Sequence, residues 1–187
     1  MRLSSIIAGS LLAGACFLAT LPATAADAAA SPEAASPETG SIVWARQLRT
    51  PGYDTVAHLG VDGAGNVVVH GTTSGALAGP NHGNVDVFLA KYNTSGTLQW
   101  KIQRGSLQYD TAGPIAVNAA GDIIVHQIIG SDNRLVKYNS AGALVWERSL
   151  TNPVAGIFFT VNNDILAVGS NVYRYTTAGN LISKKPL

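Results

Sequence analysis

Three copies of one ten-residue pattern divide this 187-residue chain into units of similar layout. The pattern reads KYNTSGTLQW from Lys91, KYNSAGALVW from Lys137 and RYTTAGNLIS from Arg174. Further residues of the first unit recur in the same order in the second: Trp44 as Trp100, Tyr53 as Tyr109, Asp54 as Asp110, Gly65 as Gly121 and His70 as His126. Repeats in a fixed order predict an array of one supersecondary unit whose neighbouring copies bury each other's apolar faces.

Each unit is predicted to contain four short antiparallel strands. VDGAGNVVVHG, which begins at Val61, has β-branched residues beyond a glycine-rich turn, and this pattern is typical of a hairpin. FLAKYN and TLQW predict the second hairpin of the same unit. Glycines stand where these turns need a positive φ, namely Gly65, Gly121, Gly96 and Gly142.

The predicted fold class is therefore all-β, with tandem four-stranded antiparallel repeats arranged like about three blades of a β-propeller. One repeat domain is expected over residues 41–187, with units at about 41–104, 105–150 and 151–187. The strand in SIVWARQL, which precedes the first unit, is expected to be an outer strand without a blade of its own.

Two stretches, VDGAGNVVVHGTTSGALAG and DVFLAKYNTSGTLQW, resemble the bacterial seven-bladed β-propeller repeat of the SBBP type. The resemblance covers nearly all of residues 44–150 and implies a propeller in an exported or cell-surface protein. Residues 90–100 are also similar to the tryptophan-docking motif of quinoprotein propellers. That similarity implies that Trp44, Trp100 and Trp146 are structural core residues that pack between blades and touch no cofactor.

Three units are fewer than the four to eight blades with which propellers typically close, so the array is expected to have two open edges. Three outcomes remain open at this point. Two chains pair as a homodimer that completes a six-bladed ring, the strands curl into a compact barrel or short stack, or the chain is a fragment of a longer propeller protein.

The N-terminal residues 1–25 are predicted to be a secretory signal peptide. Arg2 precedes an apolar run from Leu3 to Leu21, and Ala23-Thr24-Ala25 forms a small-residue cleavage site. Cys16 raises the alternative of a lipoprotein signal, but Leu12 lies one residue too far away and a better cleavage site follows, so cleavage after Ala25 is preferred. The protein is therefore expected to be secreted or extracytoplasmic. Residues 26–40, rich in Ala, Ser and Pro, are expected to be a flexible linker.

Only 12% of the residues are charged and the net charge is +1. Phosphate backbones are bound by clustered Lys and Arg, and the chain has no basic stripe of that kind. Nucleic acid is therefore not expected as a partner.

Histidines form the only local constellation that suggests a binding site. If Asp62 pairs with Asn66 across their turn, His58 lies opposite His70, and two cross-strand histidines can share a metal ion. The second unit has Pro114 in place of His58, and His70 recurs as His126, so a structural role for His70 is preferred and no metal site is assigned. The wider set of candidate ligand-binding residues is His58, His70, His82, Asn81, Asn84 and Asp86.

Asp54 and Asp110 recur in YDT, each entering a strand, and a carboxylate there is expected to cap a turn by accepting backbone N–H bonds. Nucleophile-elbow, zinc-protease, P-loop and dinucleotide fingerprints do not occur in the sequence, and no catalytic residues or cofactors are expected.

Two functional hypotheses follow. The first is a secreted or surface-associated non-catalytic binding or scaffold protein, whose ligand is a surface glycan or another protein and whose contact surface is the loop over residues 74–86. The alternative is a propeller-type enzyme, quinoprotein-like or a hydrolase. A deep pocket with paired carboxylates would favour the enzyme, whereas a shallow loop surface would favour recognition.

Overall fold

The computed structural model describes residues 5–9, 17–20 and 42–187. Within these residues the regular secondary structure consists of strands alone. It follows that this part of the chain contains no helix long and apolar enough to span a membrane. The predicted all-β class is confirmed.

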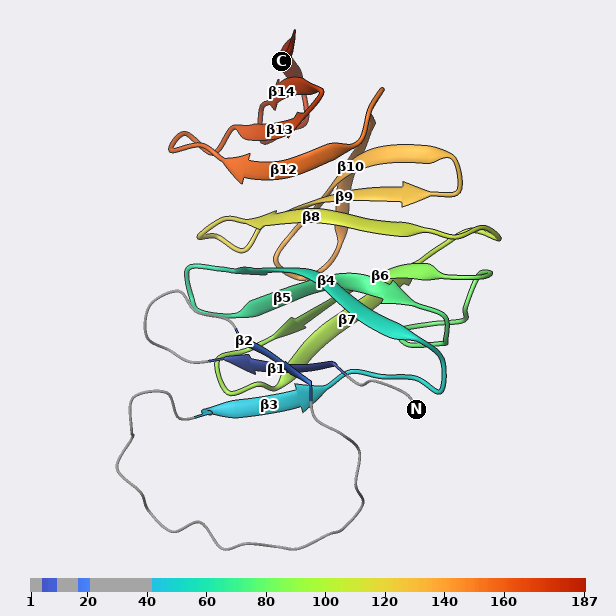
Figure 1. Cartoon of the computed structure of the whole chain (residues 1–187). Coiled ribbons are helices and arrows are strands. Elements are labelled where there is room, and N and C mark those ends of the chain that lie inside the picture. Colours follow the sequence, from blue (N-terminus) through green and yellow to red (C-terminus); the bar gives the residue numbers. More distant parts are fainter. Residues whose placement is uncertain (1–4, 10–16, 21–41) are drawn as a thin grey trace, which may run out of the picture.

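Three four-stranded antiparallel sheets follow one another along the described chain, and we call them blades 1, 2 and 3 (Figure 1). Blade 1 contains β4 (Asp54–Val61), β5 (Val67–Thr73), β6 (Asp86–Tyr92) and β7 (Leu98–Arg104). Blade 2 contains β8 (Thr111–Val117), β9 (Ile123–Ile129), β10 (Asp132–Tyr138) and β11 (Leu144–Ser149). Blade 3 contains β12 (Val154–Phe159), β13 (Ile165–Gly169), β14 (Asn171–Tyr175) and β15 (Leu181–Pro186). In each blade the strands are ordered as in the sequence, so the predicted four strands per unit are confirmed.

The hairpin turns form where the sequence predicts them. Asp62 N–H donates to the Asn66 carbonyl at 3.0 Å, and Gly65 takes a φ of 80°. Gly96 takes a φ of 72° in the second hairpin, and it also lies against the Trp44 ring, where a Cβ atom would come within 2.7 Å. Glycine is therefore required there both by backbone conformation and by space.

The core consists of three layers of apolar side chains, each on one face of a blade. Val68 and Leu89 of blade 1 share a cluster with Ile123 and Val125 of blade 2. Between blades 2 and 3, the cluster contains Ile124, Leu135, Trp146, Ile165, Ala167, Tyr173 and Tyr175. The third cluster covers the other face of blade 1 and contains Trp44, Val67, Val69, Leu77, Phe88, Ala90 and Tyr92. Each middle strand therefore contributes apolar residues to both faces, which explains why these strands are almost continuously hydrophobic.

A tryptophan docks the outer strand of blade 1 onto blade 2, and another docks the outer strand of blade 2 onto blade 3. Trp100 Nε1 donates to the Ser140 carbonyl at 3.1 Å, and Trp146 Nε1 donates to the Thr177 carbonyl at 3.0 Å. Trp44, on the strand before blade 1, makes the same bond to the Thr94 carbonyl at 3.0 Å. Each of these tryptophans thus contacts the backbone of another part of the array through its indole N–H group.

A lysine contacts the same carbonyl oxygen as the tryptophan at each of the two interfaces between blades. Lys91 Nζ contacts Asp62 Oδ2 of its own blade at 2.9 Å and the Ser140 carbonyl of the next blade at 3.4 Å. Lys137 repeats this arrangement with Asp122 and the Thr177 carbonyl. Because both lysines are buried, each blade interface contains a desolvated cation that is paired on one side and hydrogen-bonded on the other.

The strand before blade 1, predicted as an outer strand without a blade of its own, belongs to none of the three blades. β3 (Trp44–Gln47) pairs with β1 (Ser5–Gly9), which pairs with β2 (Phe17–Thr20), in a sheet of order β2-β1-β3. Unpaired backbone groups along a strand edge favour such pairing, and the N-terminal residues supply the missing neighbours. The predicted cleavage site after Ala25, Cys16 and the linker 26–40 lie outside the described residues.

Candidate functional site

The loops that enter each blade and the loops between its second and third strands lie at the same end of the array, because neighbouring strands run in opposite directions. At this end, Tyr109 in the loop before β8 forms a parallel bridge with Val85 in the loop before β6. Asp110 N–H donates to the Val85 carbonyl at 2.9 Å. Blades 1 and 2 are thus joined through their backbones at this surface, which we call the entry end.

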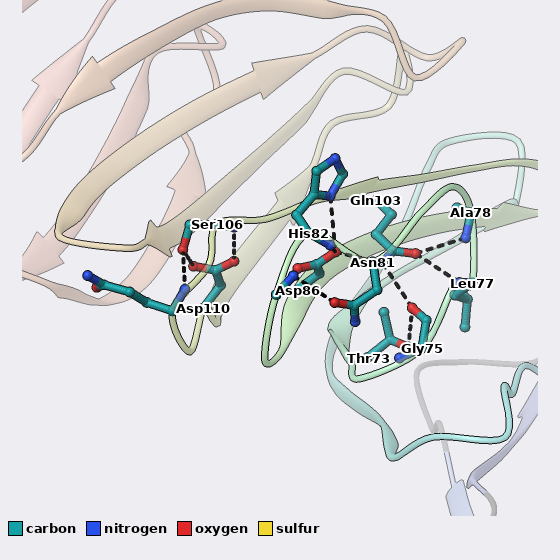
Figure 2. Close-up of polar contacts among 12 residues, drawn as sticks. Thr73, Gly75, Leu77, Ala78, Asn81, His82, Asp86, Gln103, Ser106 and Asp110 are labelled. Carbon is teal, nitrogen blue, oxygen red and sulfur yellow. Dashed lines mark hydrogen bonds and ion pairs between the residues drawn. The ribbon is translucent and has the colours of Figure 1, made fainter.

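Two aspartates hold the entry loops in place: Asp110 is fully buried and Asp54 is partly buried. Asp110 accepts hydrogen bonds of 2.7 Å from Ser106 N–H and the Ser106 hydroxyl (Figure 2). It accepts a third bond of 2.7 Å from Gly130 N–H. Asp54 does the same in blade 1, accepting from Thr50 N–H at 2.5 Å and from the Thr73 hydroxyl at 2.5 Å. The prediction that both carboxylates cap turns is confirmed, and their oxygens are occupied by protein donors.

Hydrogen bonds to the side chain of Gln103 hold the loop over residues 74–86 in place. Gln103 Oε1 accepts from Leu77 N–H at 2.9 Å and Ala78 N–H at 3.0 Å, while Gln103 Nε2 donates to Asp86 Oδ2 at 2.7 Å (Figure 2). Sequence reasoning did not single out Gln103. Comparison of the repeats does point to a link between Gln103 and the long loop. The second unit lacks that loop and has Ser149 in the place of Gln103.

The candidate residues of this loop lie at different depths. Asp86 is fully buried and accepts from His82 N–H at 3.0 Å and His82 Nδ1 at 3.2 Å. Asn84 is exposed, Asn81 is partly buried, and 46% of the His82 side chain is accessible. Asp86 therefore lies beneath the loop surface, and His82 and Asn84 lie on it.

Gly105 allows two buried carboxylates to approach each other across the interface of blades 1 and 2. A Cβ atom on Gly105 would lie 1.9 Å from Asp86 Oδ1 and 3.0 Å from Asp110 Oδ2. Among the residues that the structure describes, Asp86 Oδ1 has no hydrogen-bond partner. Any side chain at Gly105 would displace one of the two carboxylates that hold the entry loops.

Three large side chains project from the entry loops. Tyr53 is 81% exposed, Leu107 is 87% exposed and Tyr109 is 61% exposed. Each stands close to a capping aspartate whose bonds fix the loop backbone beneath it. Sequence reasoning noted the repeated tyrosines only as part of YDT, although an aromatic residue recurring beside a turn cap is a signal for a surface position.

The histidines do not converge on one point. His58 and His70 are directly opposite in the β4–β5 ladder, as predicted, although a β-bulge precedes His58. His58 is exposed, whereas His70 is fully buried; His70 Nδ1 donates to the Gly113 carbonyl at 2.9 Å and Nε2 accepts from Gln127 Nε2 at 3.4 Å. With both ring nitrogens engaged, His70 has no lone pair left for a metal. The described residues include no group of three or more His, Cys, Asp or Glu side chains that could hold a metal ion.

Burial of His70 predicts a pH dependence of stability. Desolvation lowers the pKa of His70 from 6.5 to about 3, and burial also lowers the pKa of His126. Between these two values for His70 the unfolded chain binds a proton that the folded chain does not, so stability falls as the pH drops below about 6.5. We expect His70 to lower the free energy of unfolding by about 2 kcal/mol between pH 7 and pH 5. Urea denaturation at both pH values measures this loss.

The control is His70→Gln, whose amide can still donate to the Gly113 carbonyl. This variant should lose most of the difference between pH 7 and pH 5 and keep only the part that other groups such as His126 contribute. An unchanged pH dependence in His70→Gln would show that His70 is not the group responsible.

Comparison with known proteins supports a propeller-type array. A protein of unknown function from Bacteroides caccae aligns with 100% of this chain and 59% of its own, at 13% identity and a TM-score of 0.52. BamB from Moraxella catarrhalis aligns over 80% of this chain and 41% of its own, at 16% identity and a TM-score of 0.55. A streptogramin B lyase aligns over 77% of this chain and 45% of its own, at 20% identity and a TM-score of 0.53.

The chain thus spans between 41% and 59% of the length of these structures, and at such identities the likeness concerns the fold alone. No curated protein matches the chain. One family model, described as outer membrane protein assembly factor BamB, matches residues 81–182, which is more than half of the chain. These residues include the second hairpin of blade 1, all of blade 2 and nearly all of blade 3. The chain belongs to the family described as outer membrane protein assembly factor BamB.

Proposed function

We propose that this protein is a non-catalytic binding or scaffold protein that acts outside the cytoplasm and holds a polypeptide at its entry end. The observation that carries the proposal is the group Tyr53, Leu107 and Tyr109, three exposed large side chains on loops whose backbone is held by Asp54 and Asp110. An exposed aromatic ring on a rigid loop loses little conformational entropy on binding and offers both an apolar face and a hydroxyl group.

The spacing of these side chains suits an extended segment. Tyr53 and Tyr109 precede the first strands of adjacent blades, and packed sheets lie about 10 Å apart. His82 and Asn84 lie on the same end and supply polar groups beside the aromatic rings. Exposed aromatic and polar side chains of this kind support recognition of another chain better than they support catalysis.

The acidic residues of the entry end give little support to the hypothesis that the protein is an enzyme. Asp54 and Asp110 use their oxygens to hold backbone N–H groups, and a carboxylate so engaged cannot also act as a general base without releasing its loop. The streptogramin B lyase is an enzyme by its description, but at 20% identity the likeness gives the fold and not the activity.

Two further features support the proposed location. The N-terminal sequence has the layout of a secretory signal, and the family is described as an assembly factor for outer membrane proteins. Both agree with a protein of the cell envelope, and the SBBP-type resemblance of residues 44–150 points the same way. The ligand class that fits this setting is a polypeptide rather than a glycan.

Site-specific photo-crosslinking tests the proposal. Benzoylphenylalanine is placed at Tyr109, at Tyr53 or at Val161, which is 100% exposed at the opposite end of blade 3, in cells that produce the full chain. We expect irradiation to give a discrete protease-sensitive adduct from Tyr109 and Tyr53 but not from Val161. The same adducts from all three positions, or none from the two tyrosines, would contradict a recognition surface at the entry end. An adduct that resists protease and is removed by glycosidases would replace the polypeptide with a glycan.

A further inference from the structure

Two buried carboxylates from different parts of the chain face each other at the entry end (Figure 2). Asp86 begins β6 of blade 1, and Asp110 lies directly before β8 of blade 2. Both residues are fully buried. The space beside Gly105 joins them, because a Cβ atom there would lie 1.9 Å from Asp86 Oδ1 and 3.0 Å from Asp110 Oδ2.

The two oxygens that face each other have acceptor capacity that the protein does not use. Asp86 Oδ1 has no hydrogen-bond partner among the described residues, whereas Asp86 Oδ2 accepts from His82 N–H and Gln103 Nε2. Asp110 Oδ2 accepts from Ser106 N–H at 2.7 Å, and a carboxylate oxygen has a second lone pair. A ligand that accepts electron pairs from both oxygens would satisfy them together.

The charge of this pair is also uncompensated. At the interface between blades 1 and 2, the buried Lys91 pairs with Asp62 at 2.9 Å. Among the residues that the structure describes, no Lys or Arg side chain forms an ion pair with Asp86 or Asp110. Buried charges in proteins are paired or coordinate metals. Two buried carboxylates without a cation from the chain therefore point to a cation from solution.

We propose that Asp86 Oδ1 and Asp110 Oδ2 bind one Ca²⁺ ion, with water or backbone carbonyl groups completing its coordination. Oxygens at these distances from the Cβ position of Gly105 are no more than about 5 Å apart, which is about twice the calcium–oxygen distance of 2.3–2.6 Å. Calcium tolerates irregular sets of oxygen ligands, whereas magnesium requires a nearly ideal octahedron. With two carboxylates, the affinity falls in the range of weak extracellular calcium modules, a Kd of about 0.1–1 mM.

The bound ion would join two segments of the entry end. One is the loop over residues 74–86, and the other is the loop before β8, which carries Leu107 and Tyr109. The backbones of these segments already meet at the bridge between Val85 and Tyr109. The calcium site stands on the two carboxylates alone and does not depend on the proposed recognition of a polypeptide.

The equivalent positions between blades 2 and 3 do not form such a site. Asp132 is the counterpart of Asp86, because each begins the third strand of its blade and pairs with the last residue of the second strand. The Asp132 side chain is 56% exposed and pairs with Arg134. Pro153 stands directly before β12, where Asp110 stands before β8. Asp132 is therefore a matched control for Asp86.

Thermal denaturation of the purified full chain with calcium chloride tests the site. After treatment with EDTA, about 10 mM CaCl₂ should raise the Tm by about 3–10 °C, because calcium binds the folded state. The same concentration of MgCl₂ should raise the Tm by less than half as much. No shift with CaCl₂, or the same shift with both salts, would overturn the proposal.

Asp86→Asn removes the proposed ligand and keeps the contacts of the loop. The amide oxygen can accept the bonds from His82 and Gln103, and the amide N–H₂ group takes the place of Oδ1 beside Asp110. We expect its Tm in EDTA to equal or exceed that of the wild type, and its calcium shift to be lost. Asp132→Asn should keep the full calcium shift.

Two outcomes with these variants would contradict the site. If Asp86→Asn raises the Tm while calcium leaves the wild type unchanged, a proton and not a metal ion joins the carboxylates. If Asp132→Asn loses as much of the calcium shift as Asp86→Asn, calcium binds the surface in general.

Hydrogen exchange of the wild type gives a readout that does not require a variant to fold. Calcium should slow amide exchange in residues 82–86 and 105–110 and leave β13 and β14 of blade 3 unchanged. Slowing of the same size throughout the three blades, or none near Gly105, would contradict calcium binding between Asp86 and Asp110.

Discussion

Replacing Trp146 with alanine is expected to lower the free energy of unfolding by about 3–5 kcal/mol. Trp146 is 8% exposed, donates to the Thr177 carbonyl at 3.0 Å and packs against Gly179, where a Cβ atom would lie 2.9 Å from the ring. Alanine removes this packing and leaves a cavity between blades 2 and 3, because the rigid sheets on either side cannot close it. Urea denaturation of the wild type and the variant measures the difference.

Leu144→Ala provides the matched control, since Leu144 lies on the same strand but is half-exposed. Leu144→Ala should lower the free energy of unfolding by about 0.5 kcal/mol, as expected for a surface position. Hydrogen exchange supplies a second readout: in Trp146→Ala, amide exchange should accelerate more in β13 and β14 than in β5 and β6. Equal acceleration in all blades, or a stability change below 1 kcal/mol, would show that Trp146 does not act as the docking residue between blades 2 and 3.

Replacing Asp110 with alanine is expected to lower the free energy of unfolding by about 3 kcal/mol or more. The buried carboxylate accepts hydrogen bonds from Ser106 N–H and Gly130 N–H, and alanine leaves both backbone donors without this partner. Hydrogen bonds to a charged group contribute about 1.5–3 kcal/mol each, although neighbouring bonds do not add fully. Thermal and urea denaturation of the variant test this value.

Asp132→Asn is the control for Asp110→Ala, because Asp132 begins β10 and Asp110 lies directly before β8. The Asp132 side chain is 56% exposed and pairs with Arg134 at the surface. A surface ion pair of this kind contributes less than about 1 kcal/mol. If Asp110→Ala lowers the free energy of unfolding no more than Asp132→Asn does, the capping role assigned to Asp110 is wrong.

If Asp110→Ala lowers the free energy of unfolding as expected, the photo-crosslink from Tyr109 should also weaken. The loop that carries Tyr109 would then lack the hydrogen bonds that hold it.

The repeat made most of the fold predictable. Each hairpin carries its own local signal, such as Asp62 and Asn66 around Gly65, and the recurrence of that signal in the second unit predicted the same four strands there. The docking of Trp44, Trp100 and Trp146 was predictable for the same reason, because a large residue at one repeated position must be accommodated by a repeated surface.

The candidate site was predictable only in part. Asp54 and Asp110 have local hydrogen-bond partners four residues away, so their capping role is visible in the sequence. The burial of Asp86 depends on Gln103, which lies on another strand and carries no turn signal of its own. The pairing of β3 with β1 could not be anticipated either, because the N-terminal residues lie outside the repeat and share none of its positions.

Photo-crosslinking from Tyr109 in the exported protein, after its N-terminus has been identified, tests the central claim most directly. The account treats the entry end as the surface that holds a polypeptide, with Tyr109 exposed on a loop held by Asp110. It predicts an N-terminus near Ala26 and a protease-sensitive adduct from Tyr109 but not from Val161. Equal adducts from both positions, or none from Tyr109, would contradict the account.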